Sequence, residues 1–127
     1  MPKVETLTKF EWEIMKQVWK KGRATVREVH EALAPTQSRA YTTIQTYMER
    51  LVDKKYLSKK KIGLVNFYSA KVKETDTLRR ETSHFVKRAF DGSFSKLAAF
   101  LFDTQDFDAE DLETIKRLIQ EKERKND

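Results

Sequence analysis

The chain has 127 residues, of which 39% are hydrophobic and 36% are charged, with a net charge of +6 and no cysteine. This length fits one domain, or one small domain with an appendage, and the lack of thiols excludes disulfides, thiolate metal sites and cysteine nucleophiles. No apolar run is long enough to span a membrane and the N-terminus has no signal-peptide core, so we expect a cytoplasmic protein without membrane contact.

The charge is unevenly distributed. Residues 1–72 carry a net charge of +8, and residues 73–127 carry a net charge of −2. A basic first half indicates a domain that binds a polyanion, although excess lysine also keeps a small protein in solution. We therefore expect a head domain over 1–72 and a tail domain over 73–127 with a different role.

The first predicted helix covers Thr8–Lys21. Thr8 and Glu11 have capping-box spacing, and Gly22 provides the C-terminal stop. Its apolar stripe consists of Trp12, Ile14, Met15, Val18 and Trp19. This pattern is typical of an amphipathic helix that packs one side on a core.

Two further helices are predicted before residue 56. Thr25 and Glu28 form a second capping-box pair, which begins a short helix that ends before Pro35. Ser38 is the expected cap of a third helix, which continues to about Lys55. The inward positions are Val26, Val29 and Leu33 in the second helix, and Tyr41, Ile44, Met48, Leu51 and Val52 in the third.

After the third helix the apolar period changes from helical to alternating. Residues 56–61 and 66–70 read as two strands joined by a turn at Gly63. Three helices followed by a β-hairpin form the plan of a winged helix-turn-helix. We therefore expect a mainly α fold with a small β-hairpin wing at about residues 57–69.

From Thr75 onward the sequence is helical again, and the last helix begins at the pair Asp108 and Asp111. Three short helices enclose too little surface for a core of their own, so their apolar stripes need a partner. The head is one option and a second copy of the tail is the other, and symmetric dimers are the commonest oligomers. The predicted dimerisation residues are Leu78, Phe85, Val86, Phe90, Leu97, Leu101, Leu112, Ile115 and Ile119.

The third helix has threonines on its polar side, where a helix normally carries better helix formers. Arg39, Thr43, Thr46 and Arg50 have the spacing of one helical face, and Thr42 lies on its flank. Short hydroxyl side chains and arginines suit a helix that enters the major groove of DNA. Threonine is also common on ordinary surfaces, so this face alone leaves both interpretations open.

Three consecutive lysines on the predicted wing favour the DNA-binding interpretation. Lys59, Lys60 and Lys61 lie where a winged helix meets the phosphate backbone. Lysines on an edge strand also protect against aggregation. The combination of a groove-shaped helix face and a basic wing predicts binding to double-stranded DNA.

Several segments together resemble the penicillinase repressor family of bacterial transcription regulators. They are TKFEWEIMKQVWKKG, TIQTYMERLVDKK, the hairpin from Gly63 to Ser69 and the tail segment TSHFVKRAFDGSFSKLAAFLFD. The resemblance extends from about Leu7 to Ile119. It implies a winged-helix head, a helical dimerisation tail, and a homodimer that represses transcription from a palindromic operator.

The resemblance also implies a switch. In antibiotic-responsive members, a sensor protease pathway ends in cleavage of the tail between asparagine and phenylalanine, and the equivalent bond here joins Ala99 to Phe100. Three positions depart from the family pattern. Lys55 stands where glycine is usual, Leu64 where a basic residue is frequent, and Ala99 where the cleaved bond has asparagine.

Other chemistry is sparse. His30 and His84 are the only histidines and lie far apart in the sequence, so we expect packing or surface roles. The acidic residues between Asp103 and Asp111 lack calcium-loop spacing, and no glycine pair forms a phosphate loop. We expect no metal, no cofactor and no enzymatic activity.

One alternative from another class stays open at this point. Many winged helices bind proteins, so the chain could be an interaction module without sequence-specific DNA binding. Selection from random DNA separates the two hypotheses, because a dimeric repressor enriches a two-fold palindrome and an interaction module enriches nothing.

Overall fold

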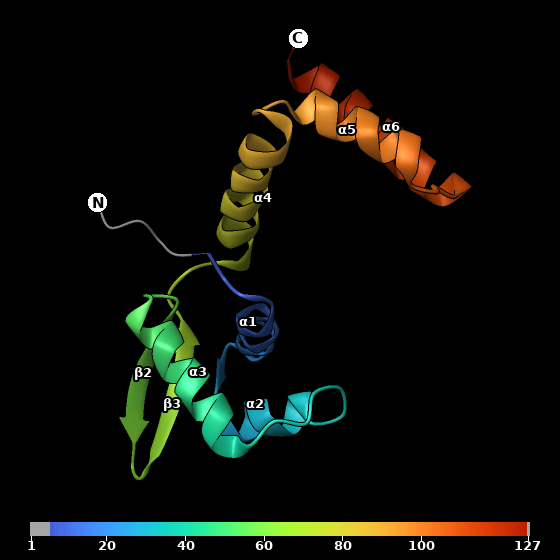
Figure 1. Cartoon of the computed structure of the whole chain (residues 1–127). Helices are drawn as coiled ribbons and strands as arrows, with labels where there is room; N and C mark the ends of the chain where they lie inside the picture. Colours follow the sequence, from blue (N-terminus) through green and yellow to red (C-terminus); the bar gives the residue numbers. More distant parts are fainter. Residues whose placement is uncertain (1–5, 127) are drawn as a thin grey trace. The chain divides into compact units, whose positions relative to one another are not determined.

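The computed structural model describes residues 6–126 (Figure 1). The first part of the chain combines three helices with three strands, and the part that follows is entirely helical. They are α1 Lys9–Lys21, β1 Arg23–Ala24, α2 Val26–Leu33, α3 Tyr41–Asp53, β2 Leu57–Ile62, β3 Val65–Ala70, α4 Glu74–Phe90, α5 Phe94–Thr104 and α6 Ala109–Lys125. The predicted fold class, a winged helix-turn-helix followed by a helical tail, is confirmed.

The sheet has three antiparallel strands in the order β1-β3-β2. The hairpin of β2 and β3 was predicted, and its register pairs Leu57 with Ala70 and Ile62 with Val65. The strand β1 was not predicted, because two residues are too short to show an alternating pattern. β1 pairs with β3 through Ala24 and Tyr68, which attaches the hairpin to the chain between α1 and α2.

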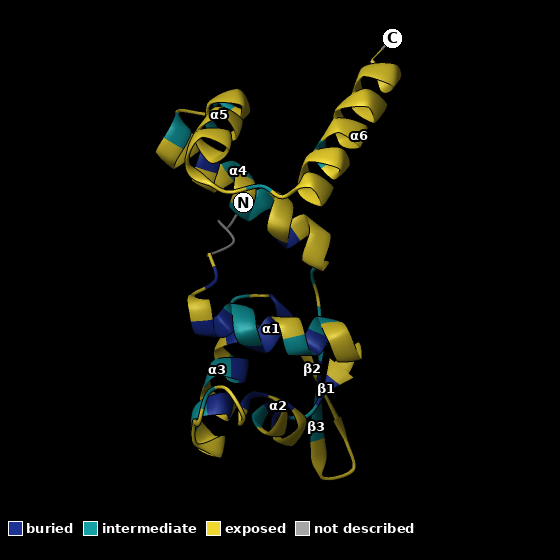
Figure 2. Ribbon diagram, turned by 90° about the vertical axis from the view of Figure 1, so that its right-hand side faces the viewer, coloured by how far each residue is buried: buried dark blue, intermediate teal, exposed yellow. Residues whose placement is uncertain are grey.

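One hydrophobic core lies inside the head, between α1, α2, α3 and the sheet. Figure 2 shows the buried residues in these elements, whereas α5 and α6 are mainly exposed. Both predicted capping boxes are present, at Thr8 with Glu11 and at Thr25 with Glu28. The fully buried core side chains include Ile14, Met15, Val18, Val29, Ile44, Met48, Leu51, Tyr56, Leu57 and Tyr68.

A buried ion pair joins the beginning of α1 to the end of α3. The ammonium of Lys54 lies 3.0 and 2.9 Å from the two carboxylate oxygens of Glu11, whose side chain is 2% exposed. The backbone N–H of Thr8 donates to the same carboxylate at 2.8 Å. Burial by itself raises the pKa of Glu11, but the bonds from Lys54 and Thr8 outweigh it and lower the pKa.

The third helix differs from its prediction at both ends. It begins at Tyr41, its N-cap is Ala40, and no side chain caps it, so the expected cap at Ser38 is wrong. It ends at Asp53 rather than at about Lys55. Lys55 has a φ of 72°, which is the left-handed conformation that glycine adopts most easily and that ends a helix.

The chain divides into two compact units, residues 1–82 and residues 83–127. The first unit includes the start of α4, because Arg80 donates to the hydroxyl of Tyr56 at 2.6 Å and the Trp19 indole donates to the Val72 carbonyl at 2.9 Å. In the second unit, Phe90 of α4 contacts Phe100 of α5, with ring centroids 5.8 Å apart. The predicted functional boundary after residue 72 stays a prediction.

Substitution of Lys55 by glycine is expected to stabilise the protein. A side chain at positive φ costs about 1–2 kcal/mol, and glycine removes this cost while losing some of the gain to a more flexible unfolded chain. We expect a net increase of about 1 kcal/mol in the free energy of unfolding, measured by urea denaturation. Lys55→Ala is the control, since it removes the charge and keeps the strain; an equal gain from alanine contradicts the explanation.

The Glu11–Lys54 pair predicts a specific pH dependence of stability. Because folding lowers the pKa of Glu11 below its ordinary 4.5, its contribution is present above that pH and is lost as the pH falls through the lower folded-state pKa. At pH 7, Glu11→Gln should lower the free energy of unfolding by about 1–3 kcal/mol, and the difference should shrink at pH 3.5.

Glu28→Gln is the matched control for this measurement. Glu28 has the equivalent position in the capping box of α2, but its bonds to Thr25 are exposed to solvent. The control should therefore cost only a few tenths of a kcal/mol at pH 7. Urea denaturation of the parent and both variants at the two pH values checks the prediction, and equal effects of the two substitutions contradict it.

Candidate nucleic-acid interface

The outward side of α3 lies opposite its buried stripe. Ile44, Met48 and Leu51 are fully buried, so the residues half a turn away face solvent. Thr42 and Thr46 lie at the centre of this outward side and are exposed. Of the other predicted residues, Arg50 is exposed and Thr43 is partly buried, and both lie on one flank.

The hydroxyl of Thr46 already has a partner within the helix. It donates to the backbone carbonyl of Thr42 at 2.9 Å, a common bond for threonine inside a helix. The oxygen keeps its lone pairs, and the methyl group stays exposed. Thr46 therefore presents an acceptor and an apolar surface, which suit a base amino group and a thymine methyl.

Arg39 does not belong to this face, because it precedes the helix. Its guanidinium lies 4.5 Å from the ring centroid of Phe10, and its carbonyl accepts a hydrogen bond from Nε2 of His30 at 2.9 Å. The helical spacing that grouped Arg39 with Thr43 was therefore wrong. His30 is partly buried against this loop and has the packing role that the sequence predicted.

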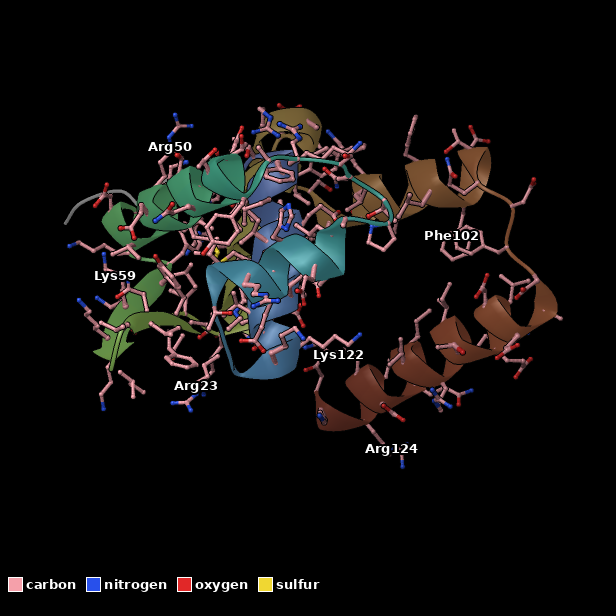
Figure 3. All side chains as sticks on the ribbon, turned by 90° about the horizontal axis from the view of Figure 1, so that it is seen from below. Arg23, Arg50, Lys59, Phe102, Lys122 and Arg124 are labelled. Carbon is pink, nitrogen blue, oxygen red and sulfur yellow. The ribbon has the colours of Figure 1, made fainter. Side chains whose placement is uncertain are left out.

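Arg50 extends away from the body of the head (Figure 3), with its guanidinium 5.3 Å from the ring centroid of Tyr47. Glu49, its neighbour in the sequence, pairs with Lys59, at 3.1 Å. The guanidinium of Arg50 is thus exposed on the same side of the head as the threonines.

The register of the wing separates the three lysines. Lys59 lies opposite Tyr68 and Lys60 opposite Phe67, and successive side chains of a strand point to opposite faces. Lys59 binds Glu49 of α3, so Lys59 and Lys61 lie on the face toward α3, and Lys60 lies on the other face. All three are exposed, but only Lys59 has an ion pair among the residues that the structure describes.

The hydroxyl of the buried Tyr68 also donates a hydrogen bond to the carboxylate of Glu49, at 2.5 Å. The bonds from Tyr68 and Lys59 hold the pKa of Glu49 below its usual value against the opposing effect of burial. Burial and the nearby Glu49 raise the pKa of Tyr68. Glu49 therefore stays ionised and Tyr68 stays protonated at neutral pH.

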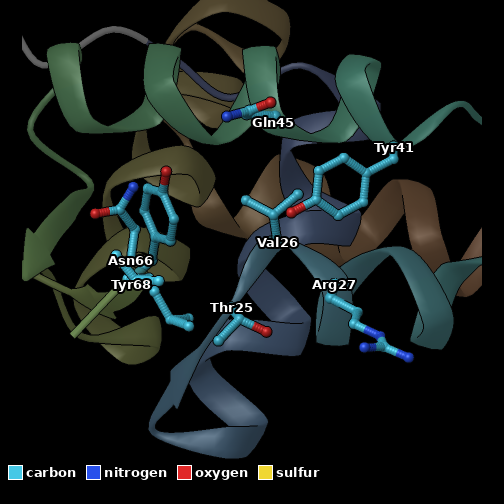
Figure 4. A pocket seen from close by; sticks show the side chains of 9 residues that line it. Thr25, Val26, Arg27, Tyr41, Gln45, Asn66 and Tyr68 are labelled. Atoms are coloured by element: carbon cyan, nitrogen blue, oxygen red, sulfur yellow. The ribbon is translucent and has the colours of Figure 1, made fainter. Parts of the chain in front are cut away.

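A recess of about 480 Å³ lies between three parts of the head, namely the wing, helix α3 and the first turn of α2 (Figure 4). Gln45 of α3 lines this recess, and the sequence pattern did not identify it as a candidate DNA-binding residue. Gln45 is exposed, and a glutamine amide at this position of a recognition helix can pair with adenine. Gln45 lies beside Thr42 on an exposed flank of α3, three residues further along the helix, and this helical spacing was the signal that could have identified it.

The tip of the wing is apolar. Leu64 is 95% exposed and follows Gly63, which has a φ of 64°. Its neighbours Ile62 and Val65 are 44% and 45% exposed. The basic character of the wing therefore comes from β2 rather than from its turn.

Neither a metal centre nor a membrane span is found in residues 6–126. No cluster of three or more histidine, aspartate or glutamate side chains could hold a metal ion in this part of the chain. No described helix is sufficiently long and apolar to cross a bilayer. Within the predicted acidic cluster, Asp108 caps α6 by accepting the N–H of Asp111 at 2.7 Å.

Comparison with known proteins identifies relatives along almost the whole chain. The model of the penicillinase repressor family matches residues 7–121. A penicillinase repressor from Bacillus licheniformis is 27% identical over 95% of this chain and 94% of its own length. The methicillin resistance regulatory protein MecI from Staphylococcus aureus is 23% identical over 94% of this chain and 98% of its own length.

Two solved structures resemble the head. The DNA-binding domain of the repressor BlaI matches 60% of this chain and 93% of its own length, with 34% identity and a TM-score of 0.53. Monomeric BlaI from B. licheniformis in complex with the blaP half-operator has the same identity and coverage and a TM-score of 0.51. Both neighbours have the winged-helix fold; the first is a DNA-binding domain and the second is bound to a half-operator.

Proposed function

The chain belongs to the penicillinase repressor family, and we propose that it acts as a homodimer that represses transcription from a palindromic operator. It is a DNA-binding transcriptional repressor, like its relatives, which are not enzymes. The observation that carries the proposal is the outward side of α3, where exposed threonines and Arg50 lie opposite a fully buried stripe. A relative with this fold binds a half-operator.

In this proposal α3 reads the bases from the major groove. Thr42, Thr46 and Gln45 offer short or amide side chains close to the helix axis, and Arg50 reaches guanine edges or phosphates. Thr43 contacts the groove from the flank. Arg39 has a weaker claim, because its guanidinium packs on Phe10, and it would contact a phosphate from the loop before α3.

The wing binds the phosphate backbone through those lysines of β2 whose ammonium groups are not held by Glu49. Lys61 has the best position, because it lies on the face toward α3 and forms no ion pair among the described residues. Lys60 lies on the opposite face and contributes less. The repressor names of the relatives favour this function over a protein-interaction module without sequence-specific DNA binding.

Dimerisation through the tail is supported by its exposed apolar side chains. Leu78, Phe85, Leu101, Leu112 and Ile119 are between 38% and 51% exposed, and Phe90, Leu97 and Ile115 are partly buried. Phe94, Phe100, Phe102 and Leu118 add to this surface. Val86 differs, because it is fully buried in the single chain and is not available to a partner.

Cleavage of the tail by a sensor protease stays a prediction. Ala99 and Phe100 lie in the middle of α5 and are exposed. The ring of Phe100 packs on Phe90, so the bond also has a packing role. A cut here would remove α6 and half of α5, which would weaken the dimer without changing the head.

Selection from random DNA, followed by binding measurements, tests the division between base reading and phosphate binding. Thr46→Ala should weaken binding to the selected operator by about 1–3 kcal/mol and leave binding to random DNA nearly unchanged. Lys61→Ala should weaken both and reduce the salt slope by about one unit. Lys60→Ala is the matched control, with a smaller effect. Identical profiles of Thr46→Ala and Lys61→Ala on both DNAs contradict this division.

Removal of residues 83–127 tests the role of the tail. The shortened chain keeps Val72 and Arg80, which bind Trp19 and Tyr56 of the head. It should be monomeric in sedimentation, whereas the full chain should be a dimer. The full chain should hold the palindrome about 10²–10⁴-fold more tightly than the shortened chain holds it, because the second contact becomes intramolecular. A monomeric full chain at micromolar concentration excludes the homodimer.

A further inference from the structure

Glu49 lies on the side of α3 that faces the wing, and its carboxylate binds both wing strands. The hydroxyl of Tyr68 in β3 donates to it at 2.5 Å, and the ammonium of Lys59 in β2 lies 3.1 and 3.2 Å from its two oxygens. Lys59 and Tyr68 are paired across the hairpin. The carboxylate of Glu49 in α3 therefore binds one residue on each strand of the wing, and these two residues face each other across the hairpin.

The two bonds to Glu49 differ in their exposure to water. Tyr68 is fully buried, so its hydroxyl needs a partner inside the protein, and a carboxylate is a strong one. The side chains of Lys59 and Glu49 are 37% and 40% exposed, so water weakens the ion pair. Figure 4 shows the hydroxyl of Tyr68 directed toward α3. The tyrosine bond is therefore the stronger part of the contact.

We propose that Glu49 and Tyr68 are positioning residues that fix the wing relative to α3, and that Lys59 serves this contact rather than a DNA phosphate. The proposal rests on the proposed function, because it concerns how the two DNA-binding elements are held. β1 pairs with β3 only as far as Tyr68, so beyond the Lys59/Tyr68 pair the wing is a two-stranded ribbon, which is only marginally stable by itself. DNA has a fixed spacing between groove and backbone, so only molecules whose wing has the matching position relative to α3 make both contacts at once.

The positioning role can be measured without DNA. The chain has no cysteine, so spin labels can be attached at Thr46→Cys in α3 and Leu64→Cys at the wing tip, and their distance distribution measured by double electron–electron resonance on the full chain. Glu49→Ala should broaden the distribution. Glu31→Ala is the matched control, since Glu31 also forms an ion pair, with Arg27, but only within α2. Equal widths for the two variants overturn the proposal.

The second experiment compares two buried tyrosines on the selected operator and on random DNA. Tyr68→Phe removes the bond to Glu49 without changing the charge. It should lower the ratio of operator binding to random binding about tenfold, as expected if one molecule in ten keeps the competent arrangement, with an unchanged salt slope. Tyr56→Phe removes a hydroxyl that binds Arg80 of α4 and should leave the ratio unchanged. An equal loss from both variants overturns the proposal.

The role of Lys59 is tested by its dependence on Glu49. Glu49→Gln should release the ammonium to a phosphate and increase the salt slope by about one unit, and the double variant Glu49→Gln/Lys59→Ala should lose this increase. An increase that persists without Lys59 excludes this role. If the parent selects no DNA sequence, the proposed function fails, whereas the label distances still decide whether Glu49 fixes the wing.

Discussion

The burial of one side of α3 is the constraint on which the rest of the head depends. Ile44, Met48 and Leu51 are fully buried against the other helices and the sheet. Since a straight helix can bury only one side in such a small core, the opposite side must face solvent. The apolar stripe therefore determines which residues of α3 face solvent and are available for the proposed contact with DNA.

Hydrophobic packing has little directional preference, so polar contacts set the orientation of α3 more sharply. The Glu11–Lys54 pair joins its C-terminal end to α1, and the bond between Glu49 and Tyr68 joins its middle to the wing. Each carboxylate binds two or more donors, and that of Glu11 is buried, where polar groups require such partners. These two contacts therefore fix α1, α3 and the wing relative to one another.

The second unit is built differently. An aromatic contact between Phe90 and Phe100 joins α4 to α5, and Phe102 of α5 packs on Phe107 of the loop that follows. Large apolar side chains of these helices stay exposed. A surface of this kind is unusual for a chain that works alone, because exposed apolar area is unfavourable in water. The head thus completes its own core, whereas the tail leaves large apolar side chains exposed, which supports the proposed dimer.

Elements whose signals are local could be predicted from the amino-acid sequence. Capping boxes at Thr8 and Thr25, the stop at Gly22 and the change of period after α3 all act over a few residues, and each was predicted correctly. Only the tertiary structure decided the partners of the charged side chains. Lys54, Lys59 and Arg39 look alike as exposed cations in the sequence, yet they bind Glu11, Glu49 and the ring of Phe10. Their partners lie 10 to 43 residues away in the case of the two lysines, and such distant pairings depend on how the core packs, which no local pattern encodes.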